Sequence, residues 1–114
     1  MAGISNPHRS EEADQLFKPK EYRSVDNRVV AYRDVCVHEF RMGDVEDPDL
    51  YAAQPLSNWQ NSESGAWIMA HAVDVPFWHR VADPYSYGFK YLIIARLSEP
   101  DELFWTLKYK GKQQ

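Results

Sequence analysis

The segment from Pro55 to Val73 constrains the fold of this chain more than any other, because its apolar side chains recur at three- and four-residue steps. On a helix this spacing gathers them into one stripe about a third of the circumference wide, which the rest of the chain has to cover. Gly65 lies on the opposite face and costs about 1 kcal/mol relative to alanine inside a helix. The alternative is that the helix is interrupted over residues 61–65, which would divide the segment into two shorter helices. The stripe consists of Leu56, Trp59, Glu63, Ala66, Trp67, Ala70 and Val73.

The length of 114 residues predicts a single folded domain, which at this size buries roughly two-thirds of the surface that the unfolded chain exposes. Residues 1–20 are polar, with scattered apolar side chains and neither hydrophobic period. We therefore expect a flexible N-terminal arm over 1–20, followed by one domain over 21–114. The pair Leu16-Phe17 is the exception within the arm, and it is a candidate for docking onto the body or onto another subunit.

The charge balance argues against phosphate and membrane partners. Thirteen basic and seventeen acidic side chains give a formal net charge of −4 without a long basic run, which is not the pattern of a surface for nucleic acid or anionic lipid. The apolar runs fall short of the roughly 18 residues that a membrane span needs. The single cysteine, Cys36, has no disulfide partner within the chain, which is typical of a reducing compartment. We therefore expect a soluble, cytoplasmic protein that carries no cofactor.

Residues Arg28 to Met42 are mostly β-branched, aromatic or small, which favours one long strand or two short ones over a helix. An acidic run follows over residues 44–49 and is expected to form a solvated loop. Asp47 stands immediately before Pro48, and a capping residue followed by proline is a favoured helix start. We therefore expect a short helix over Pro48 to Gln54, ahead of the main helix.

After Pro76 the hydrophobic period changes from about 3.6 to 2. This change predicts strands over residues 77–81, 89–97 and 103–110, separated by turns at 83–88 and 98–101. The middle strand is apolar on nearly both faces and is expected at the centre of the sheet. The predicted fold class is α+β, a single domain with one main helix packed on a four-stranded, mostly antiparallel sheet in the order strand, helix, three-stranded meander.

Glu63 is the sharpest candidate for chemistry, because it is an acid within an apolar stripe between Trp59 and Trp67. Burial there would raise the pKa of its carboxyl and suit it to general acid or base catalysis in a pocket between helix and sheet, with His71 or His79 as partner. The structural alternative is a locally wider stripe, or a Glu63 carboxylate that accepts hydrogen bonds from an indole N–H or from Arg80.

Other chemical signatures are weak. We expect no metal site, because His38, Glu39, His71, His79 and Asp83 lack a recognised metal-binding spacing and the acidic run departs from a calcium-binding loop. No nucleophile elbow and no phosphate-binding glycine loop is present. A platform for single-stranded nucleic acid on one sheet face is a third possibility, against ordinary cross-strand aromatic pairing. Its residues would be Tyr85, Tyr87, Phe89 and Tyr109, with Lys90, Lys108 and Lys110.

The pattern of the chain resembles that of short uncharacterised proteins of tailed phages over roughly residues 30–110. The resemblance is carried by the run from Met42 to Ala53, then by Trp59-Gln60, Ser62-Glu63, Gly65 and Trp67, and later by Tyr87-Gly88 and Leu107-Lys108-Tyr109. It implies a phage context, in which small aromatic-rich domains are virion components or host-interaction proteins, located in the host cytoplasm or the virion. It implies no catalytic residues.

Four Trp, seven Tyr and five Phe are a heavy aromatic content for this length, and aromatic side chains dominate interface energetics. Together with the polar arm and the missing catalytic signatures, this content favours a non-enzymatic interaction or structural protein that self-associates or binds a protein partner. The expected contact residues are Leu16, Phe17, Asp44, Glu46, Asp47, Asp49, Trp78 and Trp105.

Overall fold

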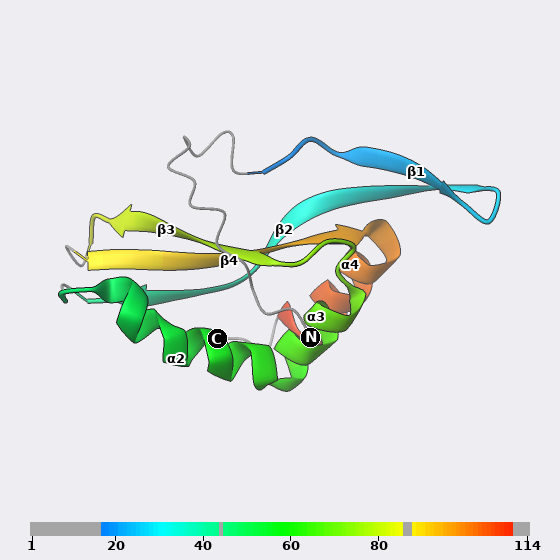
Figure 1. Ribbon diagram of the computed structural model, residues 1–114. Coiled ribbons are helices and arrows are strands. Elements are labelled where there is room, and N and C mark those ends of the chain that lie inside the picture. The colour runs from blue at the N-terminus through cyan, green and yellow to red at the C-terminus, as the bar shows by residue number, and fades with distance from the viewer. Residues whose placement is uncertain (1–16, 44, 86–87, 111–114) are drawn as a thin grey trace.

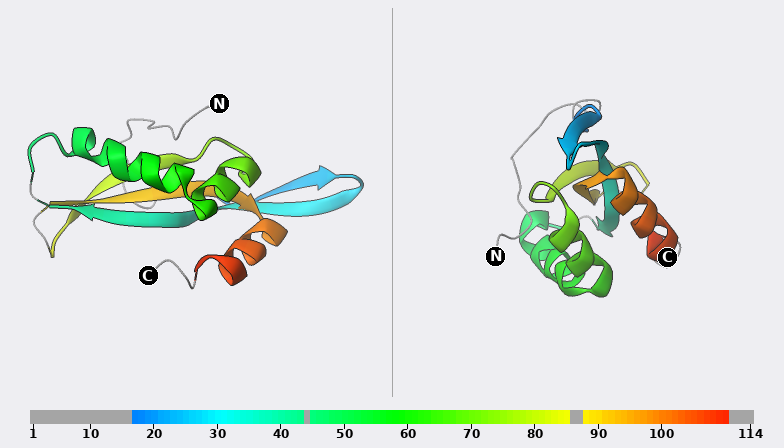
Figure 2. Two further views of the ribbon diagram at one scale, coloured as in Figure 1. Left: turned by 90° about the horizontal axis from the view of Figure 1, so that it is seen from below. Right: turned by 90° about the vertical axis from the view of Figure 1, so that its right-hand side faces the viewer.

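A computed structural model describes residues 17–43, 45–85 and 88–110, which form an α+β domain (Figure 1). Its four strands are antiparallel and lie in the order β1-β2-β4-β3. The helices lie together beneath one face of this sheet (Figures 1 and 2). Along the chain the elements are β1 (Glu21–Val25), β2 (Arg28–Met42), α2 (Pro48–Asn61), α3 (Glu63–His71), β3 (Phe77–Asp83), β4 (Gly88–Ser98) and α4 (Glu99–Lys108).

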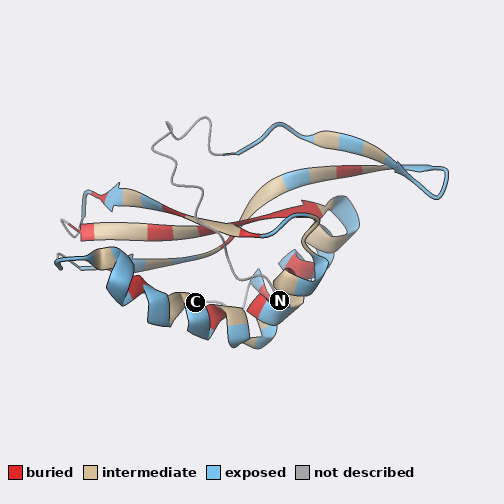
Figure 3. Cartoon of the chain, in the orientation of Figure 1, coloured by how far each residue is buried: buried red, intermediate tan, exposed pale blue. Residues whose placement is uncertain are grey.

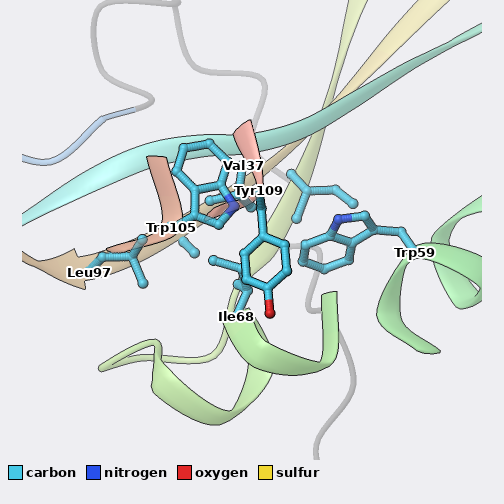
Figure 4. Packing of buried hydrophobic residues seen from close by; sticks show 8 residues of the cluster. Val37, Trp59, Ile68, Leu97, Trp105 and Tyr109 are labelled. Atoms are coloured by element: carbon cyan, nitrogen blue, oxygen red, sulfur yellow. The ribbon is translucent and has the colours of Figure 1, made fainter. Parts of the chain in front are cut away.

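The hydrophobic core fills the space between the sheet and these helices. Residues of β2 and β4 meet Trp59 from α2, Ile68 from α3 and Trp105 from α4, and Tyr109 at the end of α4 closes the cluster (Figure 4). The buried stretches of β4 run along the middle of the sheet, as expected for a strand that is apolar on both faces (Figure 3). The sheet residues of the core are Val37, Ile93, Ala95 and Leu97.

The long strand β2 is interrupted by a bulge between Cys36 and His38, where its register with β4 shifts. An extra residue places two consecutive side chains on the same side of a strand. Val37 therefore packs in the core, and the neighbouring His38 also faces the helices, its ring stacked 5.9 Å from that of Trp59.

Residues 21–32 form a hairpin that extends past the end of the sheet (Figures 1 and 2). Asp26 and Asn27 form its turn and both have positive φ, the geometry of the two-residue turns that match the twist of paired strands. β4 pairs with β2 from Tyr32 onward. The outer part of the hairpin is therefore a two-stranded ribbon.

The single main helix is not found, because the helical segment breaks at Ser62. Its hydroxyl accepts a hydrogen bond from Gly65 N at 3.0 Å and donates to Trp59 O at 2.6 Å, which ends α2 and caps α3. The break changes the helical phase, so Gly65 is buried, and three members of the predicted stripe, Glu63, Ala66 and Ala70, are exposed. A β-carbon at Gly65 would lie 1.7 Å from Trp59 O, which explains the glycine.

The predicted last strand is wrong, because residues 99–108 form helix α4. Ser98 caps this helix by accepting a hydrogen bond from Asp101 N at 3.3 Å. Residues two apart point to nearly opposite sides of a helix. The four apolar residues expected on one strand face therefore divide into two pairs: Trp105 and Tyr109 enter the core, whereas Leu103 and Leu107 are exposed. The expected meander is thus a hairpin of β3 and β4, and the fourth strand is β1.

Candidate interaction surfaces and a cavity

The projecting hairpin exposes both apolar side chains and backbone. Tyr22, Val25 and Val29 are exposed on it. β1 is an edge strand, and no strand in the described parts of the chain pairs with its outer edge. Unpaired edges accept further strands, and exposed apolar side chains favour burial against a partner. The hairpin therefore has the properties of a contact element.

An ion pair fixes the base of the hairpin to the sheet. The Arg96 and Asp34 side chains are only 6% and 4% exposed, and their Nη1 and Oδ1 atoms lie 2.8 Å apart. Arg96 also donates to Glu21 at 3.2 Å and to the carbonyl of Pro19 at 2.8 Å. Burial alone would lower the pKa of the Arg96 guanidinium, but the bonds to Asp34 and Glu21 outweigh burial and raise the pKa. The end of the predicted flexible arm is thus attached to the body.

Helix α4 presents a second apolar strip beside the hairpin. Leu103 and Leu107, one turn apart, are exposed on it. A groove of about 800 Å³ separates the two elements, lined among others by Val29 and Leu103. Arg33 on β2 makes a two-bonded ion pair with Glu102 on α4, which fixes the spacing of the groove. We call the exposed apolar residues Tyr22, Val29, Leu103 and Leu107 the hairpin–α4 surface.

The acidic run is only partly available to a partner. Glu46 and Asp47 are exposed, and Asp44 lies outside the described residues. Asp47 precedes α2 as predicted, but its side chain makes no capping bond. Asp49 accepts hydrogen bonds from the Tyr91 hydroxyl at 2.6 Å and from Arg80 at 3.1 Å, so it joins α2 to the sheet. Burial and this bond to Asp49 raise the pKa of Tyr91.

The remaining predicted contact residues divide between surface and core. Phe17 is exposed, whereas Leu16 lies outside the described residues. Trp78 is half-buried, with its ring tilted over Tyr91 at 5.3 Å. Trp105 is 3% exposed within the core, so it offers almost no surface to a partner.

A cavity of about 630 Å³ opens between the α2–α3 junction, β2 and the end of α4. Trp59, Tyr109 and His38 supply its aromatic lining. Glu63 lies at this cavity, but its side chain is 76% exposed, so the expected burial between two tryptophans is wrong. The Tyr109 hydroxyl donates to Glu63 at 3.2 Å, and Lys108 Nζ lies 3.9 Å from the same carboxylate oxygen.

The histidines expected to assist Glu63 lie elsewhere. His71 is eight residues further along α3, about 12 Å along the helix axis, and its ring stacks on Trp67 at 4.1 Å. His79 is buried in β3. The histidine that does line the cavity is His38, which the bulge in β2 directs toward the helices. Among the described residues no group of three His, Cys, Asp or Glu side chains is arranged to hold a metal ion.

The predicted nucleic-acid platform does not form one sheet face. Lys108 and Tyr109 belong to the end of α4 rather than to a strand. Phe89 lies beneath Arg80, 4.5 Å from the guanidinium carbon, and Tyr85 is exposed beyond β3. Tyr87 lies outside the described residues.

Comparison of the chain with protein-family models, curated proteins and solved structures finds no match. Among the described helices, none has the length and apolar character needed to cross a membrane.

Proposed function

We propose that this protein is a non-enzymatic interaction module that binds other protein subunits through its projecting hairpin and the adjacent face of α4. The observation that carries the proposal is a two-stranded ribbon that extends past the sheet, with an outer edge that no described strand pairs and with Tyr22 and Val29 exposed. A hairpin without further strands is marginally stable in water. Its attachment through Arg96 keeps it in one orientation, which lowers the entropic cost of binding.

Its setting, on this proposal, is the assembly of a tailed phage, as a virion component or as a protein that contacts the host. The support for this setting is the resemblance in sequence pattern to short phage proteins. On this proposal, the projecting hairpin and the hairpin–α4 surface contact the neighbouring subunit.

Association of the full chain tests the proposal, measured by light scattering coupled to size exclusion over a range of concentrations. The test variants are Tyr22→Ser and Leu103→Ser on the hairpin–α4 surface. Their controls are Tyr51→Ser and Leu50→Ser on α2, because Tyr22 and Tyr51 are 65% and 59% exposed, and Leu103 and Leu50 are 61% and 69% exposed. We expect only the first two to weaken association by tenfold or more. A chain that stays monomeric at high concentration and captures no subunit from phage-infected lysate contradicts the proposal.

A second candidate, a ligand-binding function, is favoured by the cavity beside Glu63. Its aromatic lining from Trp59 and Tyr109 suits a flat ring, and the Glu63 carboxylate suits a donor group on that ring. A screen of small aromatic amines by Trp fluorescence tests it, with Glu63→Gln as the variant and Glu46→Gln, an exposed acid outside the cavity, as control. Binding that is lost in Glu63→Gln alone supports this function, and no saturable binding counts against it.

A further inference from the structure

We infer that a partner of the hairpin is a second copy of this chain, and that the two copies pair antiparallel through the outer edge of β1, with Tyr22 opposite Tyr22. This inference rests on the proposed function and specifies the partner and its register.

The turn decides which backbone groups of β1 are free. Val25 and Arg28 flank the two-residue turn and face each other in the register. The pair next to such a turn exchanges both backbone hydrogen bonds, and bonded pairs alternate along an antiparallel ladder. Glu21, Arg23 and Val25 therefore direct their N–H and C=O groups toward β2. Tyr22 and Ser24 direct theirs outward, where no described strand meets them.

Together with Lys20, which precedes β1 on the same edge, these two residues restrict the symmetric registers to four, centred on Glu21, Tyr22, Arg23 or Ser24. A centre at Glu21 places two carboxylates directly opposite each other. A centre at Arg23 places two guanidinium groups directly opposite each other, and like charges in that position are destabilising. A centre at Ser24 brings Tyr22 opposite Asp26, which has left-handed backbone in the turn and cannot extend a ladder. The centre at Tyr22 has neither defect.

In the register centred on Tyr22, opposite charges meet on both sides of the axis. Glu21 of each copy faces Arg23 of the other, while within one copy Arg23 Nε already lies 2.8 Å from Glu21 Oε2. Pairing thus gives four alternating charges, in which each guanidinium faces two carboxylates. The bond from Arg23 is also the main cause that lowers the pKa of Glu21, so this carboxyl is ionised at neutral pH.

The other face of the ribbon supplies the apolar contact. Tyr22 stands opposite Ala31 in β2, so both side chains lie on the face that borders the groove beside α4. The two Tyr22 rings would form a cross-strand aromatic pair, which is worth roughly 0.2–1 kcal/mol beyond an alanine pair. Figure 2 shows the hairpin extending past the helices at one end of the molecule.

Cysteine cross-linking tests this register in the full chain. Cys36 is first replaced by alanine, so that the introduced cysteine is the only thiol. Tyr22→Cys then places two thiols on a bonded antiparallel pair, whose Cα atoms are about 5.5 Å apart, within the range that a disulfide spans. Ser24→Cys is the matched control on the same edge. Ser24 would face Lys20 of the other copy, which separates the two Ser24 residues by about 13 Å.

Oxidation with glutathione disulfide, followed on non-reducing gels, should convert the Tyr22→Cys chain to covalent dimer at least tenfold faster than the Ser24→Cys chain. Equal or faster cross-linking of Ser24→Cys overturns the register. If neither chain cross-links while light scattering shows dimers, the dimer does not form through the outer edge of β1, and the proposed interaction uses another surface. If every chain is monomeric, self-pairing is overturned, and capture of a phage or host subunit decides the proposed function separately.

A charge variant gives an independent readout in the natural background. Arg23→Glu should weaken self-association tenfold or more, because the Glu21 carboxylate would then face a second carboxylate on the other copy in place of a guanidinium. Arg28→Glu changes the net charge equally on the same ribbon but lies on β2, away from the outer edge. Equal weakening by both variants would show a general effect of charge and would overturn the pairing.

Discussion

Replacing Arg96 by methionine should destabilise the protein by about 3–5 kcal/mol, the cost of removing one partner from a buried ion pair. Methionine retains most of the arginine stem but leaves the Asp34 carboxylate, only 4% exposed, without its charged partner. The backbone N–H of Lys18, at 2.8 Å, would still donate to this carboxylate but carries no charge to offset it. A loss of this size is a large part of the 5–15 kcal/mol expected for a domain and corresponds to a fall in Tm of roughly 12–20 °C.

Urea unfolding followed by tryptophan fluorescence measures this loss, because Trp59 and Trp105 are both buried in the core. Arg33→Met is the matched control: Arg33 also lies on the sheet and pairs with a carboxylate, but its side chain is 55% exposed. Such surface pairs contribute about 0–1 kcal/mol. The reasoning is refuted if Arg96→Met costs less than about 1 kcal/mol, or no more than Arg33→Met.

A double-mutant cycle separates the ion pair from simple packing. If Asp34 and Arg96 stabilise each other, Asp34→Leu combined with Arg96→Met should cost clearly less than the sum of the single changes, because no unpaired charge remains buried. Hydrogen exchange adds a local readout. The bonds from Arg96 to Glu21 and to the Pro19 carbonyl predict faster exchange in β1 than in α2 when arginine is removed.

Three further predictions concern single positions. Gly65→Ala should destabilise the protein by about 2 kcal/mol or more in spite of the better helix propensity of alanine, because its β-carbon would meet Trp59 O at 1.7 Å. The reverse change at exposed Ala66, to glycine, should cost about 1 kcal/mol. Equal losses of stability at both sites in urea unfolding would contradict the clash. Ser98→Ala should lower the unfolding free energy by about 1 kcal/mol by removing the cap of α4, and an unchanged midpoint would contradict that role. The pKa of Glu21 is lowered mainly by its bond to Arg23. The ionised carboxylate therefore stabilises the fold above the ordinary carboxyl pKa of 4.5, and this stabilisation is lost as the pH falls below that value. Glu21→Gln should show a shallower loss of unfolding free energy in acid, and identical slopes of unfolding free energy against pH in the two proteins would contradict the linkage.

The strands β3 and β4 were predictable because each is an apolar run bounded by turn residues. Such runs can be recognised in a sequence without knowing which strand they pair with. Helix α4 was missed although its signals are present. Ser98, Pro100 and Asp101 suit both a type I turn and the first turn of a helix, since the two share their backbone angles. A helix brings Trp105 and Tyr109 into the core together, whereas a strand would place all four alternating apolar residues on one face. The alternating sequence is compatible with both structures.

The cavity was not predictable in its composition, because it depends on contacts between distant segments. The bulge at Val37 turns His38 toward Trp59, and nothing local in the sequence marks that position. The break at Ser62 lies within residues 61–65, where the sequence allowed one as an alternative, and it rotates Glu63 out of the stripe. The hairpin did carry a local signal, since Asp26-Asn27 is a residue pair that tolerates positive φ. Its neighbour β1 is too short and polar to stand out by hydrophobic pattern.

The buried ion pair between Arg96 and Asp34 lies where it supports the proposal that the hairpin is a rigid contact element. A buried ion pair is weak evidence for stability by itself, since apolar residues of similar volume often serve as well. Arg96, however, joins β4, β2 and the chain that leads into β1 at one point, through Asp34, Glu21 and the Pro19 carbonyl. An apolar pair at this position would support the sheet but would not fix the direction of the ribbon beyond it. Directional bonds at its base are what a projecting edge needs if it is to meet a partner in one register.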